Sequence, residues 1–139
     1  MKIRVVGIVL LGALSLTACQ TTQQAMFDSE QSQVDLRSIQ SREFDTSDKE
    51  LLMRTILATL QDLGFVIDNA DAMLGTASAT KLDGYALKMT VSVRSKSDTR
   101  SIIRANAQFN NQPVTEPKPY QDLFNALSKG LFLEAHEVS

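Results

Sequence analysis

The residue types that most often carry chemistry are scarce in this chain. Its 139 residues include one cysteine, Cys19, and one histidine, His136. A nucleophilic serine or cysteine needs a base within reach, and zinc sites take several cysteine or histidine ligands. His136 lies close to Glu134 and Glu137, where a solvated side chain is the simpler interpretation. The sequence therefore predicts neither a nucleophilic centre nor a zinc site.

The carboxylates and glycines also lack the spacing that a ligand would need. Asp68, Asp71 and Asp83 flank predicted turns, where aspartate commonly hydrogen-bonds its own backbone. A calcium loop needs closely alternating oxygen ligands, and a phosphate loop needs clustered glycines. Neither pattern is present, so we predict no enzyme, no metal and no cofactor.

Cys19 stands at the end of a segment of a different kind. Lys2 and Arg4 precede an apolar run from Val5 to Leu16, and Leu16-Thr17-Ala18-Cys19 follows with small residues. A charged start, a short apolar stretch and a small-residue end are typical of a signal peptide rather than of a membrane span. The alternative is a plain secretory signal followed by an unrelated cysteine.

This segment resembles a bacterial lipoprotein signal with its lipobox. The resemblance implies that the Cys19 thiol receives a diacylglycerol, that residues 1–18 are removed, and that the new amine is acylated. Several acyl chains anchor a protein stably, whereas one chain holds it only marginally. Gln20 stands where such lipoproteins carry aspartate when they stay in the inner membrane. The resemblance therefore implies the periplasmic face of the outer membrane, with the inner membrane as the alternative.

The composition beyond residue 18 predicts one acidic domain. The signal holds two of the 14 basic side chains and none of the 16 acidic ones, so no basic excess indicates nucleic acid. Residues 19–33 are mostly glutamine, threonine and serine, which predicts a flexible tether. Residues 34–139 are long enough for one core, which has no disulfide to reinforce it.

A helix is predicted over residues 48–63, after a strand near 39–44. Ser47 and Glu50 have the spacing of a capping box. Gly64 stands where a left-handed residue ends many helices, and Phe65 is placed to fold back over Leu60. One face of the predicted helix is apolar; it consists of Leu52, Met53, Ile56, Leu57, Leu60 and Leu63.

Strands and a second helix fill the rest of the domain. Short strands are predicted at 65–68 and 76–80, around a turn at 69–75. Strict alternation then predicts long strands at 85–94 and 100–110, joined by a loop at 95–99. Their predicted inward residues are Tyr85, Leu87, Met89, Val91, Val93, Ile103, Ala105, Ala107 and Phe109. Pro113, Pro117 and Pro119 indicate a loop, and a helix is predicted from about Pro119 to His136.

These elements predict an α+β fold in the order β-α-β-β-β-β-α. Strands with one apolar face favour a mostly antiparallel sheet, which two amphipathic helices cover to form a two-layer sandwich. Residues 40–135 weakly resemble helix-grip domains of envelope lipoproteins, on Leu60-Gln61-Asp62-Leu63-Gly64-Phe65, the acidic turn that follows and Leu74-Gly75-Thr76-Ala77. The best-known such domains belong to the C lipoprotein of the β-barrel assembly machine. Small lipoproteins of this kind serve several envelope complexes, so the resemblance implies no particular site residue.

The outward face of the two long strands is the candidate site. It carries cations and neutral polar groups without an acidic residue: Lys88, Thr90, Ser92, Arg94, Arg104, Asn106 and Gln108, with Arg100 near the end. Ile102 is apolar and lies on the same predicted face. Ordinary solvation of an antiparallel sheet is one interpretation. The other is a docking surface for an acidic protein segment or for anionic lipid head groups.

Two functional hypotheses follow from these patterns. The first is a non-catalytic, membrane-anchored accessory or scaffold subunit of an envelope assembly or transport complex, which docks another envelope protein. The second is a binding module for a small apolar or lipid-like molecule between sheet and helices. Ala105 and Ala107 are small for inward positions, and a pocket exists there if the helices leave the space over them empty.

Overall fold

The computed structural model describes residues 30, 32–82 and 86–137. The chain divides into two compact units, Met1–Gln33 and Val34–Ser139, and the elements below belong to the second. Cys19 and Tyr85 lie outside the described residues. Residues 30, 32 and 33 of the predicted tether are helical, as are residues 34–39. Strand β1 (Ser41–Phe44) begins later than predicted, because the Gln40 N–H still bonds the Leu36 carbonyl at 3.1 Å, as in a helix.

Helix α2 (Lys49–Asp62) lies where the sequence predicted it, but Asp48 and not Ser47 caps its start. The Asp48 Oδ1 atom accepts a hydrogen bond from the Leu51 N–H at 3.0 Å, which satisfies one of the free donors of the first turn. At the other end, Gly64 has a φ of +89°. The Phe65 and Gly64 N–H groups donate to the carbonyls of Leu60 and Gln61, each at 2.9 Å. This confirms the predicted Schellman closure.

The sheet is antiparallel throughout, and its strands lie in the order β1-β5-β4-β3-β2. The remaining strands are β2 (Val66–Asp71), β3 (Thr76–Leu82), β4 (Ala86–Ser97), β5 (Arg100–Phe109) and β6 (Gln112–Pro113). β2 and β4 extend into predicted turns, and each has an irregular register, between Ile67 and Asn69 and between Ser95 and Ser97. β6 pairs with β5, so Pro113 lies in a short edge strand, where its missing N–H is tolerated.

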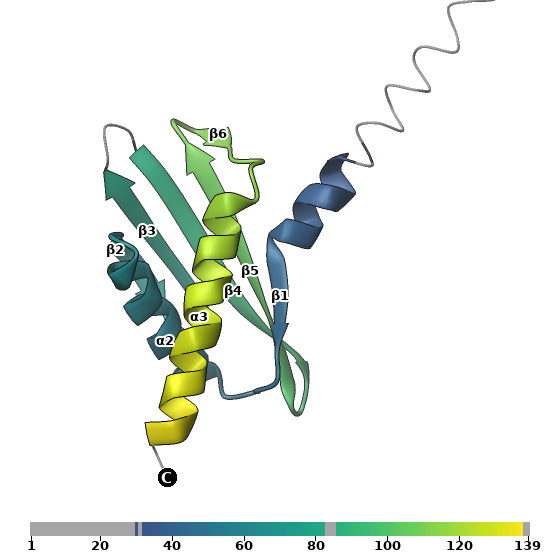
Figure 1. The fold of residues 1–139 in the computed structure, drawn as a ribbon, viewed down its shortest axis with the longest axis vertical. Helices are drawn as coiled ribbons and strands as arrows, with labels where there is room; N and C mark the ends of the chain where they lie inside the picture. The colour runs from purple at the N-terminus through teal and green to yellow at the C-terminus, as the bar shows by residue number, and fades with distance from the viewer. Residues whose placement is uncertain (1–29, 31, 83–85, 138–139) are drawn as a thin grey trace, which may run out of the picture. The chain divides into compact units, whose positions relative to one another are not determined.

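Two helices cover one face of the sheet, as Figure 1 shows. Helix α3 (Lys118–Glu137) lies beside α2, and α2 and α3 both contact the sheet. The core between the layers is formed by Phe44, Leu52, Met53, Ile56, Leu60, Phe65, Ala77, Ala79, Met89, Val91, Val93, Ile103, Ala105, Ala107, Tyr120, Leu123, Phe124 and Leu127. The predicted α+β two-layer fold is confirmed, with β6 and the helical residues 30 and 32–39 as additions. The other face of the sheet has no helix over it in the described unit.

Candidate functional site

The register of β4 and β5 brings the six predicted docking residues onto the uncovered face of the sheet, which we call the open face. Lys88 lies opposite Gln108, Thr90 opposite Asn106, Ser92 opposite Arg104, and Arg94 opposite Ile102. Directly opposed residues share a face of an antiparallel pair. The inward neighbours Met89, Val91, Val93, Ile103, Ala105 and Ala107 are buried. Ile102 is half-buried, and the other five predicted residues (Lys88, Arg94, Arg104, Asn106 and Gln108) are exposed.

Three cations on this face have no partner among the residues that the structure describes. Lys88, Arg94 and Arg104 take part in no ion pair and no side-chain hydrogen bond there. Arg94 and Arg104 are diagonal neighbours across β4 and β5. Arg104 lies opposite Ser92, which is four residues along β4 from Lys88. Lys88 and Arg104 are therefore about 13 Å apart along the strands, at roughly 3.3 Å per residue. We call Lys88, Arg94 and Arg104 the basic stripe.

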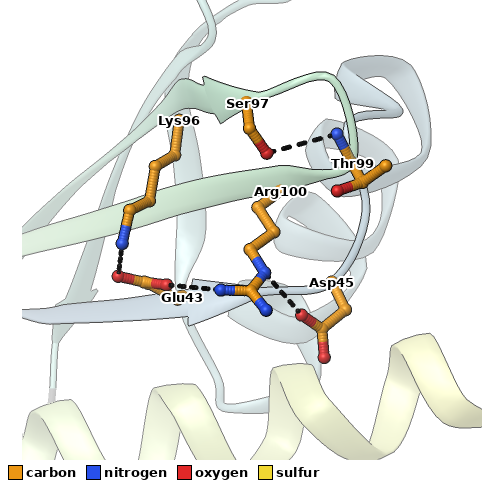
Figure 2. A network of polar contacts seen from close by, with 6 residues as sticks. All are labelled: Glu43, Asp45, Lys96, Ser97, Thr99 and Arg100. Atoms are coloured by element: carbon orange, nitrogen blue, oxygen red, sulfur yellow. Dashed lines mark hydrogen bonds and ion pairs between the residues drawn. The ribbon is translucent and has the colours of Figure 1, made fainter.

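β1 places the carboxylate of Glu43 on the open face, and Asp45 follows directly after this strand. The alternation within β4 and β5 could not predict these two carboxylates. Glu43 lies opposite Ile102, and its carboxylate pairs with Lys96 and with Arg100, whose Nη1 is 3.9 Å away (Figure 2). The Arg100 Nε atom lies 3.3 Å from Asp45 Oδ1. Arg100 is therefore ion-paired and does not belong to the basic stripe. The hydrogen bond from Lys96, with the nearby charges of Lys96 and Arg100, lowers the pKa of Glu43 below its ordinary value of 4.5.

β2 places two further carboxylates at the opposite edge. Asp71 lies opposite Thr76, in the same row of the sheet as Ser92, and its Oδ1 accepts from the Leu74 N–H at 2.9 Å. Asp68 lies at the irregular step of β2, where its Oδ2 accepts from the Thr80 hydroxyl at 2.6 Å. We predicted that these aspartates flank turns and hydrogen-bond nearby backbone. This is confirmed for Asp71, whereas Asp68 lies within β2 and accepts from a side chain on β3. The basic stripe is thus bordered by acidic residues on β1 and on β2.

The two alanines over which the sequence raised the prospect of a pocket belong to the buried core. Ala105 and Ala107 are 0% and 2% exposed, and neither lines a cavity described here. Tyr120 is buried, and its hydroxyl donates to the Val114 carbonyl at 2.6 Å and accepts from the Ala107 N–H at 3.3 Å. The Gln40 side-chain amide also reaches this hydroxyl, at 3.4 Å. β1 pairs with residues 101–104 of β5 and β6 pairs with residues 108–109, which leaves a gap between β1 and β6 along β5. The Tyr120 hydroxyl lies at this gap, where it bonds Ala107 on β5, Gln40 before β1 and Val114 after β6.

Two adjoining cavities lie at the end of the sandwich near β6. The larger, of about 480 Å³, is lined by Leu87, Phe109, Gln112, Pro113, Val114, Thr115, Glu116 and Pro119. The smaller, of about 290 Å³, shares Leu87, Glu116 and Pro119 and extends to Phe65 and Met89. Sequence reasoning missed these cavities because their walls combine segments that are distant in the sequence: the end of α2, β3, β4, the segment around β6 and the start of α3.

The remaining predicted features concern metals, membranes and relatives. Within the described part of the chain, no three histidine, cysteine or acidic residues are grouped to hold a metal ion, and no helix is both long and apolar enough to span a membrane. The His136 Nδ1 atom lies 2.7 Å from the Phe132 carbonyl, and the His136 ring is 4.1 Å from that of Phe132.

Comparison with known proteins matched this chain to no protein family and to no curated protein.

Proposed function

We propose that this chain is a lipid-anchored periplasmic protein without catalytic activity, held at the outer membrane by Cys19. It acts as an accessory or scaffold subunit of an envelope assembly or transport complex. Its open face docks another envelope protein. The observation that carries the docking proposal is the basic stripe, three cations at the centre of a sheet face that have no partner in the part of the chain that the structure describes.

The contrast between this stripe and its surroundings supports docking over simple solvation. Lys96 and Arg100, on the same hairpin, have acidic partners in Glu43 and Asp45. Among the described residues the basic stripe has none, although acidic side chains outnumber basic ones in the sequence. Unpaired charges at a surface attract a partner of opposite charge and guide its orientation more than they add affinity.

The anchor is tested by Cys19→Ala in the full chain. The substitution removes the only thiol, so we expect loss of palmitate labelling and accumulation of an uncut or mislocated precursor. Labelling and fractionation of outer membranes measure both. A Cys19→Ala chain that still labels and still sediments with outer membranes would contradict the lipoprotein assignment.

The docking face is tested by replacing Lys88, Arg94 and Arg104 together with glutamate. We expect capture of the native partner by crosslinking in cells to be lost, because three reversed charges repel an acidic partner. Stability should change by less than about 0.5 kcal/mol per site, as is usual for exposed side chains. Lys129→Glu is the control, since Lys129 is exposed on helix α3, in the other layer. Unchanged capture by the triple variant would overturn the docking proposal.

The second candidate is a binding module for a small apolar or lipid-like molecule. The cavity of about 480 Å³ favours it, because Leu87, Phe109, Val114 and two prolines give this cavity largely apolar walls. Val114→Trp should fill the cavity and abolish binding of an apolar fluorescent probe to the full chain. If this variant loses cellular function with its fold intact, while the triple reversal keeps function, the binding module replaces the docking subunit.

A further inference from the structure

The charges around the basic stripe bear on which anionic partner the open face can accept. We infer that the face takes a narrow acidic segment of another protein, laid along β4 and β5, and does not take an anionic bilayer surface. This inference rests on the proposed docking function and specifies its partner.

The first argument is the alternation of charge across the sheet. Glu43 on β1 is next to β5, and Asp68 and Asp71 on β2 are two strands from β4. Neighbouring strands lie about 4.8 Å apart, so these carboxylates are within roughly 10 Å of the central strands. That is close to the screening length of about 8 Å at physiological salt. The stripe is therefore a band of positive charge only about two strands wide.

A flat anionic surface would meet both signs of charge at once. Among the described residues, the open face and its hairpin end carry five cations, Lys88, Arg94, Lys96, Arg100 and Arg104. They also carry five carboxylates, Glu43, Asp45, Asp68, Asp71 and Asp98, the last in the turn between β4 and β5. A bilayer that covers the whole face would be attracted by the first set and repelled by the second. A segment one strand wide would lie over the cations alone. Charge complementarity thus favours the narrow partner.

The second argument is an apolar corner beside the stripe, formed by Val66 and Leu82. These side chains are 71% and 80% exposed. Val66 lies in the same row of the sheet as Thr80 and Lys88. Leu82 lies opposite Ala86, which is two residues from Lys88 along β4. An aliphatic side chain of the partner can therefore cover this corner while a neighbouring carboxylate meets Lys88.

The spacing of these groups defines the partner segment. An extended chain advances about 3.3 Å per residue, so carboxylates four residues apart span the roughly 13 Å between Lys88 and Arg104. An aliphatic residue two positions beyond the first carboxylate reaches the row of Leu82 and Ala86. Between the two cations, Thr90 and Asn106 offer hydrogen bonds. The matching probe is the peptide Leu-Thr-Glu-Thr-Thr-Thr-Glu-Thr, labelled with a fluorophore.

The experiment uses the full chain in uncharged detergent micelles and follows peptide binding by fluorescence anisotropy. We expect the probe to bind, a version with glutamine at both glutamate positions to bind at least about tenfold more weakly, and added phosphatidylglycerol to displace little of it. Lys88→Glu should weaken probe binding several-fold, whereas Lys129→Glu, an equal change of charge in the other layer, should not. Leu82→Ser should weaken it about threefold, through lost apolar contact.

Three outcomes overturn the inference. If phosphatidylglycerol displaces the probe and itself binds through the stripe, the face docks a lipid surface, and the docking function stands without this partner. If the probe binds no more tightly than its glutamine version, the stripe does not select acidic segments. If the probe fails and the triple reversal also leaves capture in cells unchanged, the proposed docking function falls with it.

Discussion

The two faces of the sheet are built from the same strands but show different kinds of order. Along β5, Ile103 and Ala105 are 0% exposed, while the alternate residues Arg104 and Asn106 are exposed. The inner face is fixed by close packing against α2 and α3, so it tolerates little change of volume. The open face is organised by charge, with a basic stripe between acidic borders. Core residues and candidate docking residues thus alternate along the strands, and a variant on one face should leave the other largely unaffected.

The largest effect is expected on the inner face, from Leu60→Ala. Leu60 is 0% exposed in the core, so the substitution removes buried methyl groups and leaves a cavity. We expect the free energy of unfolding to fall by about 2–5 kcal/mol, measured by urea denaturation. Gln61→Ala, at the exposed next position of the same helix, is the control and should change little. A loss below about 1 kcal/mol for Leu60→Ala would show that the packing is not close.

Ala105→Leu tests the division between the faces along a single strand. Ala105 is fully buried, and extra methylenes in a filled core typically cost about 1–3 kcal/mol of unfolding free energy. Asn106→Leu, at the adjacent exposed position, adds a similar apolar side chain to the open face and should change stability by less than about 0.5 kcal/mol. Equal losses for the two variants would mean that the strand does not separate packing from recognition.

Local patterns predicted the parts of the fold that these two substitutions test. The apolar stripe of α2, its glycine stop and the alternation of β4 and β5 each depend on residues close in the sequence. The same alternation correctly predicted that all six candidate docking residues share one face. Pairing with β1 could not be predicted in this way, because Glu43 meets Lys96 and Arg100 only after a strand distant in sequence joins the edge of β5. The Tyr120 hydroxyl network, which closes the gap between β1 and β6, depends on the same long-range register.

Tyr120→Phe tests that network at nearly constant volume. The change removes the hydroxyl and leaves the Ala107 N–H and the Val114 carbonyl without this partner. We expect a loss of about 1–2 kcal/mol in the free energy of unfolding, typical when a buried hydrogen-bonding group loses its partner. Faster amide exchange at Ala107 should accompany it, with the amide of Val91 on β4 as an internal reference. An unchanged exchange rate at Ala107 would mean that the Tyr120 hydroxyl does not accept a hydrogen bond from this amide in solution.

The smallest expected effect is on the open face, where Glu43 should make the β4–β5 hairpin end sensitive to acid. Its pKa lies below the ordinary 4.5, chiefly because Lys96 donates a hydrogen bond to the carboxylate. A carboxyl whose pKa is lowered in the folded state stabilises the folded state at a pH above its unfolded pKa, and this contribution is lost as the pH falls through the folded pKa.

We therefore expect the Glu43 carboxyl to titrate below pH 4.5 by NMR, with the signals of Lys96 and Arg100 shifting at the same midpoint. Glu43→Gln should abolish that coupled shift, whereas Lys88→Gln, which removes a cation without a described partner, should preserve it. A Glu43 midpoint at or above 4.5 would mean that the ion pairs on β1 do not persist in solution, and the acidic border beside the stripe would then be free to repel an anionic partner more strongly than the paired arrangement does.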